Sequence, residues 1–144
     1  SAVEAVRESC LDIIQVPGNV LDGRLRESGL FDYAAKKNVE IHVRSLYLQG
    51  LLAVESDVRP ERFNKFKELQ FFDELARKYG VTSTELALTY LTNNPVIDAG
   101  IIGCASVEEL RQTIKAYQKA KELTKFNYSE LSSLNEELLN PVNW

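Results

Sequence analysis

Apolar residues follow two patterns along this chain: short compact runs, and longer stretches in which they recur every three or four positions. The compact or alternating runs predict β-strands and the longer stretches predict helices. Strands are expected at 11–16, 39–45 and 99–104. Helices are expected at 1–10, 30–37, 63–79, 82–91 and 106–121, and in a last segment that carries Leu131, Leu134 and Leu138.

Helix ends carry their own signals. A hydroxyl or amide residue followed three positions later by Glu predicts a capping box, in which both side chains satisfy free backbone N–H groups. Asn38 and Gly80 are placed to end the helices before them, because both residue types tolerate left-handed backbone. The capping boxes are expected at Ser1–Glu4, Thr82–Glu85, Ser106–Glu109 and Asn127–Glu130.

The alternation of strand and helix predicts an α/β fold with parallel strands and helical crossovers. In such sheets ligands bind at the carboxyl ends of the strands. Gln15, Asn19, Arg44 and Ser45 fall at those ends. They are candidates for ligand binding, with the satisfaction of loop backbone groups as the competing interpretation.

The middle strand is the clearest, because its polar and apolar residues alternate at period two. Glu40, His42 and Arg44 share one face, and Ile41 and Val43 lie on the other. Three ionisable groups on one face require water, a cavity or mutual partners. A wetted edge strand and a barrel interior that opens on an active site both satisfy this requirement.

The turn at 102–109 leads from the third strand directly into a capped helix. A helix N-terminus offers free N–H groups to phosphate, and Gly103 permits close backbone approach. The turn lacks the G-x-G-x-x-G pattern of dinucleotide-binding folds. Glu108 and Glu109 compete for the same N–H groups and repel phosphate.

Composition narrows the classes of function. The formal net charge is -4 and charges of both signs are interspersed, so a nucleic-acid partner is not expected. No apolar run is long enough to span a membrane. Cys10 and Cys104 lie far apart without metal-ligand spacing and His42 is the only histidine, so we expect a cytoplasmic protein without a structural zinc site. No spacing singles out a catalytic acid–base pair.

Four segments together resemble the aldo-keto reductase family. These are 11–22, 43–52, 100–110 and the terminal 140–144, and they occur in the family's order across the whole chain. The resemblance implies a TIM (β/α)8 barrel of about twice this length. Residues 1–144 would form its C-terminal half, from the helix after strand 5 through strand 8 and the C-terminal helices.

The family reduces aldehydes or ketones with NADPH or NADH. By resemblance, its catalytic Asp–Tyr–Lys–His tetrad lies in the other half, so we assign no catalytic residue here and expect the segment alone to be inactive. This chain would supply the cofactor-binding side of an NAD(P)H-dependent oxidoreductase. An alternative is a non-catalytic regulatory or interaction subunit on the same fold, as some family members are.

The resemblance also transfers cofactor positions. Arg44 stands where many members have an aromatic residue, and Gly103, Glu109 and Thr113 stand where many carry basic residues or Asn. The loss of positive charge disfavours the 2′-phosphate of NADP, so the choice between NADP and NAD stays open. The expected cofactor-binding residues are Gln15, Arg44, Ser45, Leu46, Gly50, Gly103, Cys104, Ala105, Ser106, Glu109 and Thr113.

A half barrel leaves strand edges and an inner face uncovered, because only closure of the barrel removes them. We therefore expect the segment to associate with the missing N-terminal half or with another copy of the chain, together with a nicotinamide cofactor and a small carbonyl substrate in the intact protein. A lone, compact monomer would contradict this expectation.

Overall fold

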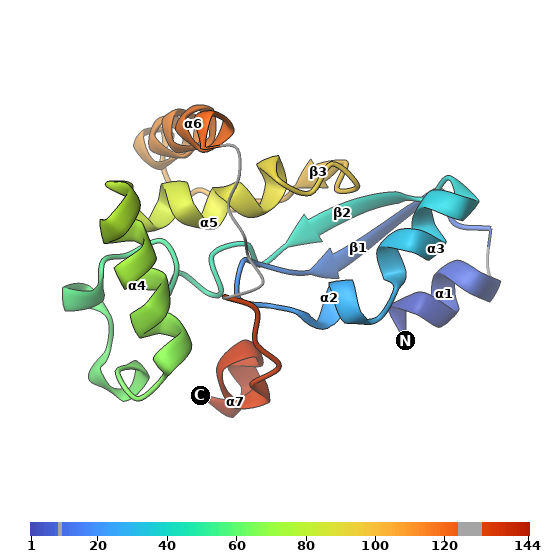
Figure 1. Ribbon diagram of the computed structural model, residues 1–144. Coiled ribbons are helices and arrows are strands. Elements are labelled where there is room, and N and C mark those ends of the chain that lie inside the picture. Colours follow the sequence, from blue (N-terminus) through green and yellow to red (C-terminus); the bar gives the residue numbers. More distant parts are fainter. Residues whose placement is uncertain (9, 124–130) are drawn as a thin grey trace.

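The computed structural model describes residues 1–8, 10–123 and 131–144 (Figure 1). Short 3₁₀ turns at Ser56–Val58, Glu61–Phe63 and Pro141–Asn143 interrupt the loops. The helices are α1 (Ala2–Glu8), α2 (Arg24–Glu27), α3 (Leu30–Lys37), α4 (Lys67–Tyr79), α5 (Ser83–Thr92), α6 (Val107–Glu122) and α7 (Glu136–Leu139), and the strands are β1 (Ile13–Pro17), β2 (Glu40–Arg44) and β3 (Ala99–Gly100).

The three strands form one parallel sheet in the order β1-β2-β3. Gln15 pairs with His42, which in turn pairs with Ala99. Each strand is followed by helical structure before the next strand begins, as a parallel sheet requires. The predicted α/β fold with three parallel strands is therefore confirmed.

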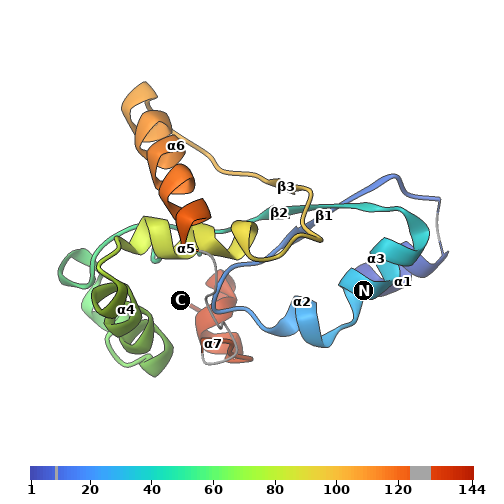
Figure 2. The same cartoon turned by 45° about the horizontal axis from the view of Figure 1, so that its top comes forward.

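The two faces of the sheet differ sharply. Val16, Ile41 and Val43 are buried, and α1, α2 and α3 lie on one side of the sheet in both views (Figures 1 and 2). On the opposite face Ile13 is 48% exposed, and His42 Nε2 lies 3.3 Å from the Glu40 carboxylate. The predicted polar face of the middle strand is thus present, and it is open in this chain.

Several predicted helix ends are confirmed. Helix α3 has the expected bounds, and Asn38 ends it with a left-handed φ of 53°. Gly80 ends α4 in the same way, with φ 63°. The capping box of Thr82 and Glu85 forms in full at the start of α5, so both side chains bond to free N–H groups there.

Other boundaries were wrong. The third strand spans only two residues instead of 99–104, because its neighbour β2 ends at Arg44 and Ser45 turns away with φ 63°. Helix α4 starts at Lys67 instead of residue 63. Phe63 belongs to a separate 3₁₀ turn, and the extended backbone of Phe66 interrupts the helical run before α4 begins.

The last predicted helix was also placed wrongly. Leu131 and Leu134 lie outside α7, and only Leu138 belongs to that helix. The predicted capping box of Asn127 and Glu130 lies outside the described residues. The four-residue α2 was not predicted, because it lacks a side-chain cap and is too short for an apolar period.

Helix α6 packs mainly on α5 and carries an uncovered face. Ala116 and Ala120 are buried with Leu88 in a small cluster of their own. Figure 2 shows α6 standing away from the sheet. The uncovered face, here called the α6 stripe, consists of Val107 (66% exposed), Leu110 (48%), Ile114 (48%) and Tyr117 (38%).

The described part of the chain contains neither a membrane-spanning helix nor a cluster of metal-ligating side chains. None of the helices there combines the length and apolar character needed to cross a membrane. Within the same part of the chain, no group of three or more His, Cys, Asp or Glu is placed to hold a metal ion.

Candidate functional site

A cavity of about 460 Å³, here called the strand-end cavity, opens at the carboxyl ends of β1 and β2. The loops after both strands and the C-terminal tail enclose it, so it combines segments far apart in sequence. Its position is the one at which parallel sheets bind ligands. It is lined by Pro17, Asn19, Asp22, Arg24, Arg44, Ser45, Leu48, Gln49 and residues 139–142.

The loop after β2 has unusual backbone geometry. Ser45, Leu48 and Gln49 have φ values of 63°, 45° and 55°, and Gly50 follows with φ 90°. Left-handed backbone at residues other than glycine costs about 1–3 kcal/mol each and concentrates at functional sites. The surrounding packing, including buried Leu46 and Leu48, holds this strained loop in place.

A second cavity of about 330 Å³, here called the α6 cavity, lies at the start of α6. The segment 44–53 contributes to both cavities, with Arg44 and Ser45 in the first and Tyr47 and Ala53 in the second. An elongated ligand that contacts both cavities would therefore lie along this segment. The α6 cavity is lined by Tyr47, Ala53, Thr84, Gly103, Cys104, Glu109, Gln112 and Thr113.

Two features of the α6 cavity fit a bound polar ligand. The buried Tyr47 hydroxyl lies beside the hydroxyl of Thr113, so two polar groups share this part of the cavity lining. Burial raises the pKa of Tyr47, and the nearby Thr113 hydroxyl offsets only part of that rise. A Cβ atom on Gly103 would meet nothing within 4 Å, so the backbone there is open to close approach.

The N-terminus of α6 is already occupied by its own side chains. The Ser106 hydroxyl accepts a hydrogen bond from the Glu109 amide (3.1 Å), as predicted. The Glu109 carboxylate accepts from the Ala105 amide at 2.7 Å. The Ser106 half of the predicted capping box therefore forms. The Glu109 carboxylate, however, bonds to the amide of Ala105 and not to that of Ser106.

The sequence-predicted site residues divide between these places. Arg44 and Ser45 line the strand-end cavity, and Arg44 Nη1 lies 3.3 Å from the Ser45 hydroxyl. Gln15 is exposed on the open face of the sheet, two residues before Pro17 of that cavity. Leu46 is buried in the core, so only its backbone is placed to meet a ligand. The α6 cavity brings together Gly103, Cys104, Glu109 and Thr113, and Ala105 and Ser106 lie at its helix start.

Two contributions to the cavities were not predicted from the sequence. These are Tyr47 and the C-terminal tail, residues 131–144. Tyr47 sits in a loop, and no local pattern distinguishes a buried tyrosine there from an exposed one. The tail reaches the strand-end cavity because Ser133 pairs with Leu21 and Gly23 through backbone hydrogen bonds (2.7 and 3.1 Å). Long-range pairing of this kind has no local sequence signal.

Buried and charged side chains fix the tail further. Asp22 is buried and accepts from Arg24 Nε (2.8 Å) and Nη2 (2.7 Å), while Arg24 Nη1 reaches Glu136 (3.1 Å). The Glu68 carboxylate of α4 accepts from the Ser133 hydroxyl (3.0 Å) and the Asn135 amide (3.1 Å). The wall that the tail gives the strand-end cavity therefore depends on carboxylates.

Acid should release the tail. Burial acts to raise the pKa of Glu68, but hydrogen bonds from its own backbone, Asn135 and Ser133 outweigh burial and lower it. A carboxylate whose pKa is lower in the folded than in the unfolded protein stabilises the fold fully at pH values above its unfolded-state pKa. This stabilisation is lost as the pH falls through the folded-state pKa. Trp144, the only tryptophan, packs edge-on against Phe63 at 4.9 Å, so its fluorescence should report the release below about pH 4.5.

A matched pair of variants tests the assignment to Glu68. Glu68→Gln should reduce the acid-induced change in Trp144 emission, because it removes the titrating group that holds Ser133 and Asn135. Glu74→Gln, an exposed change on the same helix, should leave the change intact. An acid transition in Glu68→Gln equal to that of the unaltered chain would contradict the role of Glu68.

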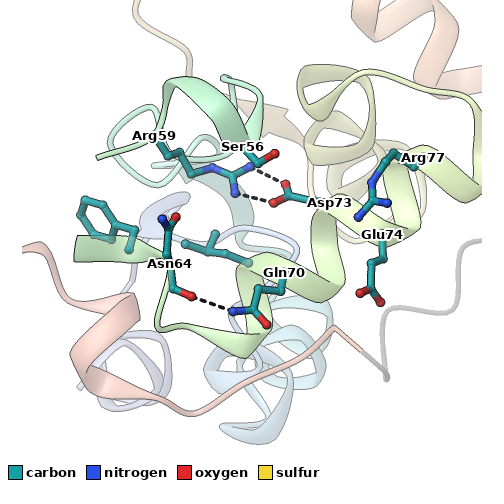
Figure 3. Close-up of a pocket in the computed structure, with 9 residues that line it drawn as sticks. Ser56, Arg59, Asn64, Gln70, Asp73, Glu74 and Arg77 are labelled. Carbon is teal, nitrogen blue, oxygen red and sulfur yellow. Dashed lines mark hydrogen bonds and ion pairs between the residues drawn. The ribbon is translucent and has the colours of Figure 1, made fainter. Parts of the chain in front are cut away.

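A third cavity, of about 310 Å³, lies between α4 and the loop before it (Figure 3). Its dominant feature is the ion pair of Arg59 with Asp73, with contacts of 2.7 and 2.5 Å. Arg59 also donates to the backbone carbonyls of Leu51 (2.8 Å) and Val54 (3.2 Å). Arg59 thus uses its donors to fix the end of segment 44–53. The ion pair is therefore a structural anchor for the strand-end cavity and the α6 cavity.

Comparison with known proteins gives consistent matches. The sequence model of the Aldo/keto reductase family matches residues 3–136. An aldo-keto reductase from Bacillus halodurans superposes with a TM-score of 0.68 in its holo form (22% identity) and 0.67 in its apo form (20%). Each match covers 90% of this chain and 46% of the other, so the chain spans about half the length of these structures.

A curated relative is similar over a shorter stretch. The uncharacterised oxidoreductase YrpG of Bacillus subtilis (strain 168) is 41% identical over 51 residues. The aligned part is 35% of this chain and 16% of that protein. The structural matches give the (β/α)8 barrel as the fold to which the three parallel strands correspond.

Proposed function

The chain belongs to the aldo/keto reductase family, and on that basis we propose that it forms the cofactor-binding side of an NAD(P)H-dependent oxidoreductase acting on aldehydes or ketones. The observation that carries the proposal is the strained segment 44–53, which lines both the strand-end cavity and the α6 cavity. A nicotinamide dinucleotide is an elongated molecule with polar groups at both ends, and it suits two cavities joined by one loop.

The chemistry of the residues in and beside the two cavities supports this assignment. Gln15 would bind the nicotinamide amide, and the planar guanidinium of Arg44 would stack on the ring or pair with phosphate. The backbone of Ser45, Leu46 and Gly50 would lie along the pyrophosphate. The cofactor supplies the hydride when bound. The adenosine end would occupy the α6 cavity, with Gly103, Cys104, Ala105, Ser106, Glu109 and Thr113 around it.

We assign no proton donor for the carbonyl to this chain. His42 contacts Glu40 on the open face of the sheet, and Tyr47 faces the α6 cavity. The proposal is therefore that the catalytic tetrad comes from barrel strands outside this segment. The segment alone should bind cofactor weakly and show no reductase activity.

The same proposal gives the uncovered surfaces a role. The α6 stripe is an apolar surface that water does not favour, and the open face of the sheet exposes Ile13 among polar and charged side chains. We propose that the other barrel strands and their helices cover them in the intact protein, and that another copy of the chain covers them when the segment is alone. The intact barrel would then take a small carbonyl substrate at the carboxyl ends of its strands.

A fluorescence titration of NADH and NADPH with the full-length gene product tests the function. We expect saturable binding, and a loss of about tenfold in affinity for Arg44→Ala, because charge-assisted contacts contribute about 1.5–3 kcal/mol. Arg26→Ala, an exposed change on α2, is the matched control and should bind normally. Failure of the full-length protein to bind either nucleotide would refute the proposal and favour the non-catalytic subunit.

A further inference from the structure

We propose that Glu109 makes this site select NAD(H) over NADP(H), so that the α6 cavity takes an adenosine ribose whose hydroxyls are free. This inference rests on the proposed cofactor site and adds a specificity-determining residue to it. It starts from the observed position of the Glu109 carboxylate, which lines the cavity and accepts from the Ala105 amide at 2.7 Å.

The amide groups that would attract a phosphate are already engaged. A helix N-terminus binds phosphate through free N–H groups and its partial positive charge. Here the Ala105 amide donates to Glu109, and the Glu109 amide donates to Ser106. A phosphate ester at this place would have to displace a carboxylate from its bond and then lie beside it.

No positive side chain lines the α6 cavity within the described residues. Arg111 is two positions after Glu109, which places it about 200° around the helix. Lys119 pairs with Glu122 at 2.7 Å. The 2′-phosphate of NADP would thus bring nearly two negative charges close to Glu109 without a cation to compensate them.

A ribose with free hydroxyls would be attracted by Glu109, because its hydroxyls donate hydrogen bonds to a carboxylate. An ionised carboxylate has about four acceptor positions, and the Ala105 amide uses one of them. Glu109 is exposed toward solvent, so its remaining positions are accessible to hydroxyl donors. Gln112 and Thr113 add further polar side chains to the same cavity lining.

The test compares NADH with NADPH, and 5′-AMP with 2′,5′-ADP as probes of the adenosine end alone, on the full-length gene product. Each pair differs only by the 2′-phosphate. We expect NADH and 5′-AMP to bind at least about tenfold more tightly than their 2′-phosphorylated counterparts at low ionic strength, with the ratio falling as salt screens the repulsion. Glu109→Gln should bring the ratio close to one, and Glu109→Arg should reverse it.

Glu122→Gln is the matched control, because it removes the same charge from an exposed residue at the other end of α6, away from the cavity lining. Equal or tighter binding of NADPH by the unaltered protein would overturn the inference while leaving the proposed function intact. An effect of Glu122→Gln equal to that of Glu109→Gln would overturn the assignment to Glu109. Failure to bind any of the four probes would reject both the cofactor site and its selectivity.

Discussion

Replacing Arg59 with alanine should lower the free energy of unfolding by about 3–5 kcal/mol, because it leaves Asp73 largely buried without its partner. The Arg59 side chain is only 3% exposed and donates to two carboxylate oxygens and two backbone carbonyls. All of these acceptors would be left unsatisfied. Urea unfolding of the full-length protein, followed by circular dichroism, measures the loss.

Two further variants separate the buried pair from general charge effects. Arg77→Ala, an exposed change in the same cavity (Figure 3), should stay within about 0.5 kcal/mol of the unaltered protein. The double change of Arg59→Met with Asp73→Asn should be more stable than Arg59→Ala, since it removes both charges with little change in side-chain volume. Equal losses for Arg59→Ala and Arg77→Ala would contradict the anchoring role.

The anchor also has a functional consequence. Arg59 fixes the carbonyls of Leu51 and Val54, at the end of the segment that lines both cavities. Loss of these bonds should let the strained backbone of Leu48 and Gln49 relax, because strained backbone persists only where surrounding contacts hold it. Faster amide hydrogen exchange at residues 46–54 of the Arg59 variant would reveal this relaxation before activity is measured.

The isolated chain should associate in a concentration-dependent way, and changes in the α6 stripe should weaken this association. Leu110→Lys with Ile114→Lys places two charges in the centre of four exposed apolar residues. A charged side chain cannot be buried there without a partner, so we expect the midpoint concentration for association to rise at least about tenfold. Gel filtration at several concentrations measures it.

The matched control adds the same two units of charge elsewhere on α6. Glu108→Gln with Glu122→Gln lies outside the stripe and should leave association unchanged. An unaltered chain that stays monomeric at every concentration would count against an uncovered barrel surface. Association that persists in the Leu110 and Ile114 variant would place the contact elsewhere, for example on the open face around Ile13.

The sequence pattern predicted the parallel sheet because its signals are local. Alternation in 39–45 needs only neighbouring residues, and Asn38 and Gly80 end their helices through their own backbone preferences. The site could be predicted only in outline. Family resemblance pointed to Glu109 and Thr113, and the structure places both on one cavity.

What sequence reasoning missed depends on contacts between distant segments. Arg59 looks like an ordinary loop charge, and its partner Asp73 comes 14 positions later on a helix that packs over it. Leu48 and Gln49 give no sign of left-handed backbone, because neither residue type prefers it. Tertiary packing imposes both features, and no window of the sequence contains the groups responsible.

The mounting of α6 on α5 has a consequence for how a ligand would be held. Its buried residues among those described are small, Ala116 and Ala120, and Thr92 donates a hydrogen bond to the Ala120 carbonyl (3.3 Å). So little buried apolar surface makes α6 a unit that opens before the rest of the domain unfolds. A molecule bound between Tyr47 and Glu109 would bridge this unit to the domain, and its dissociation would then follow the undocking of a whole helix.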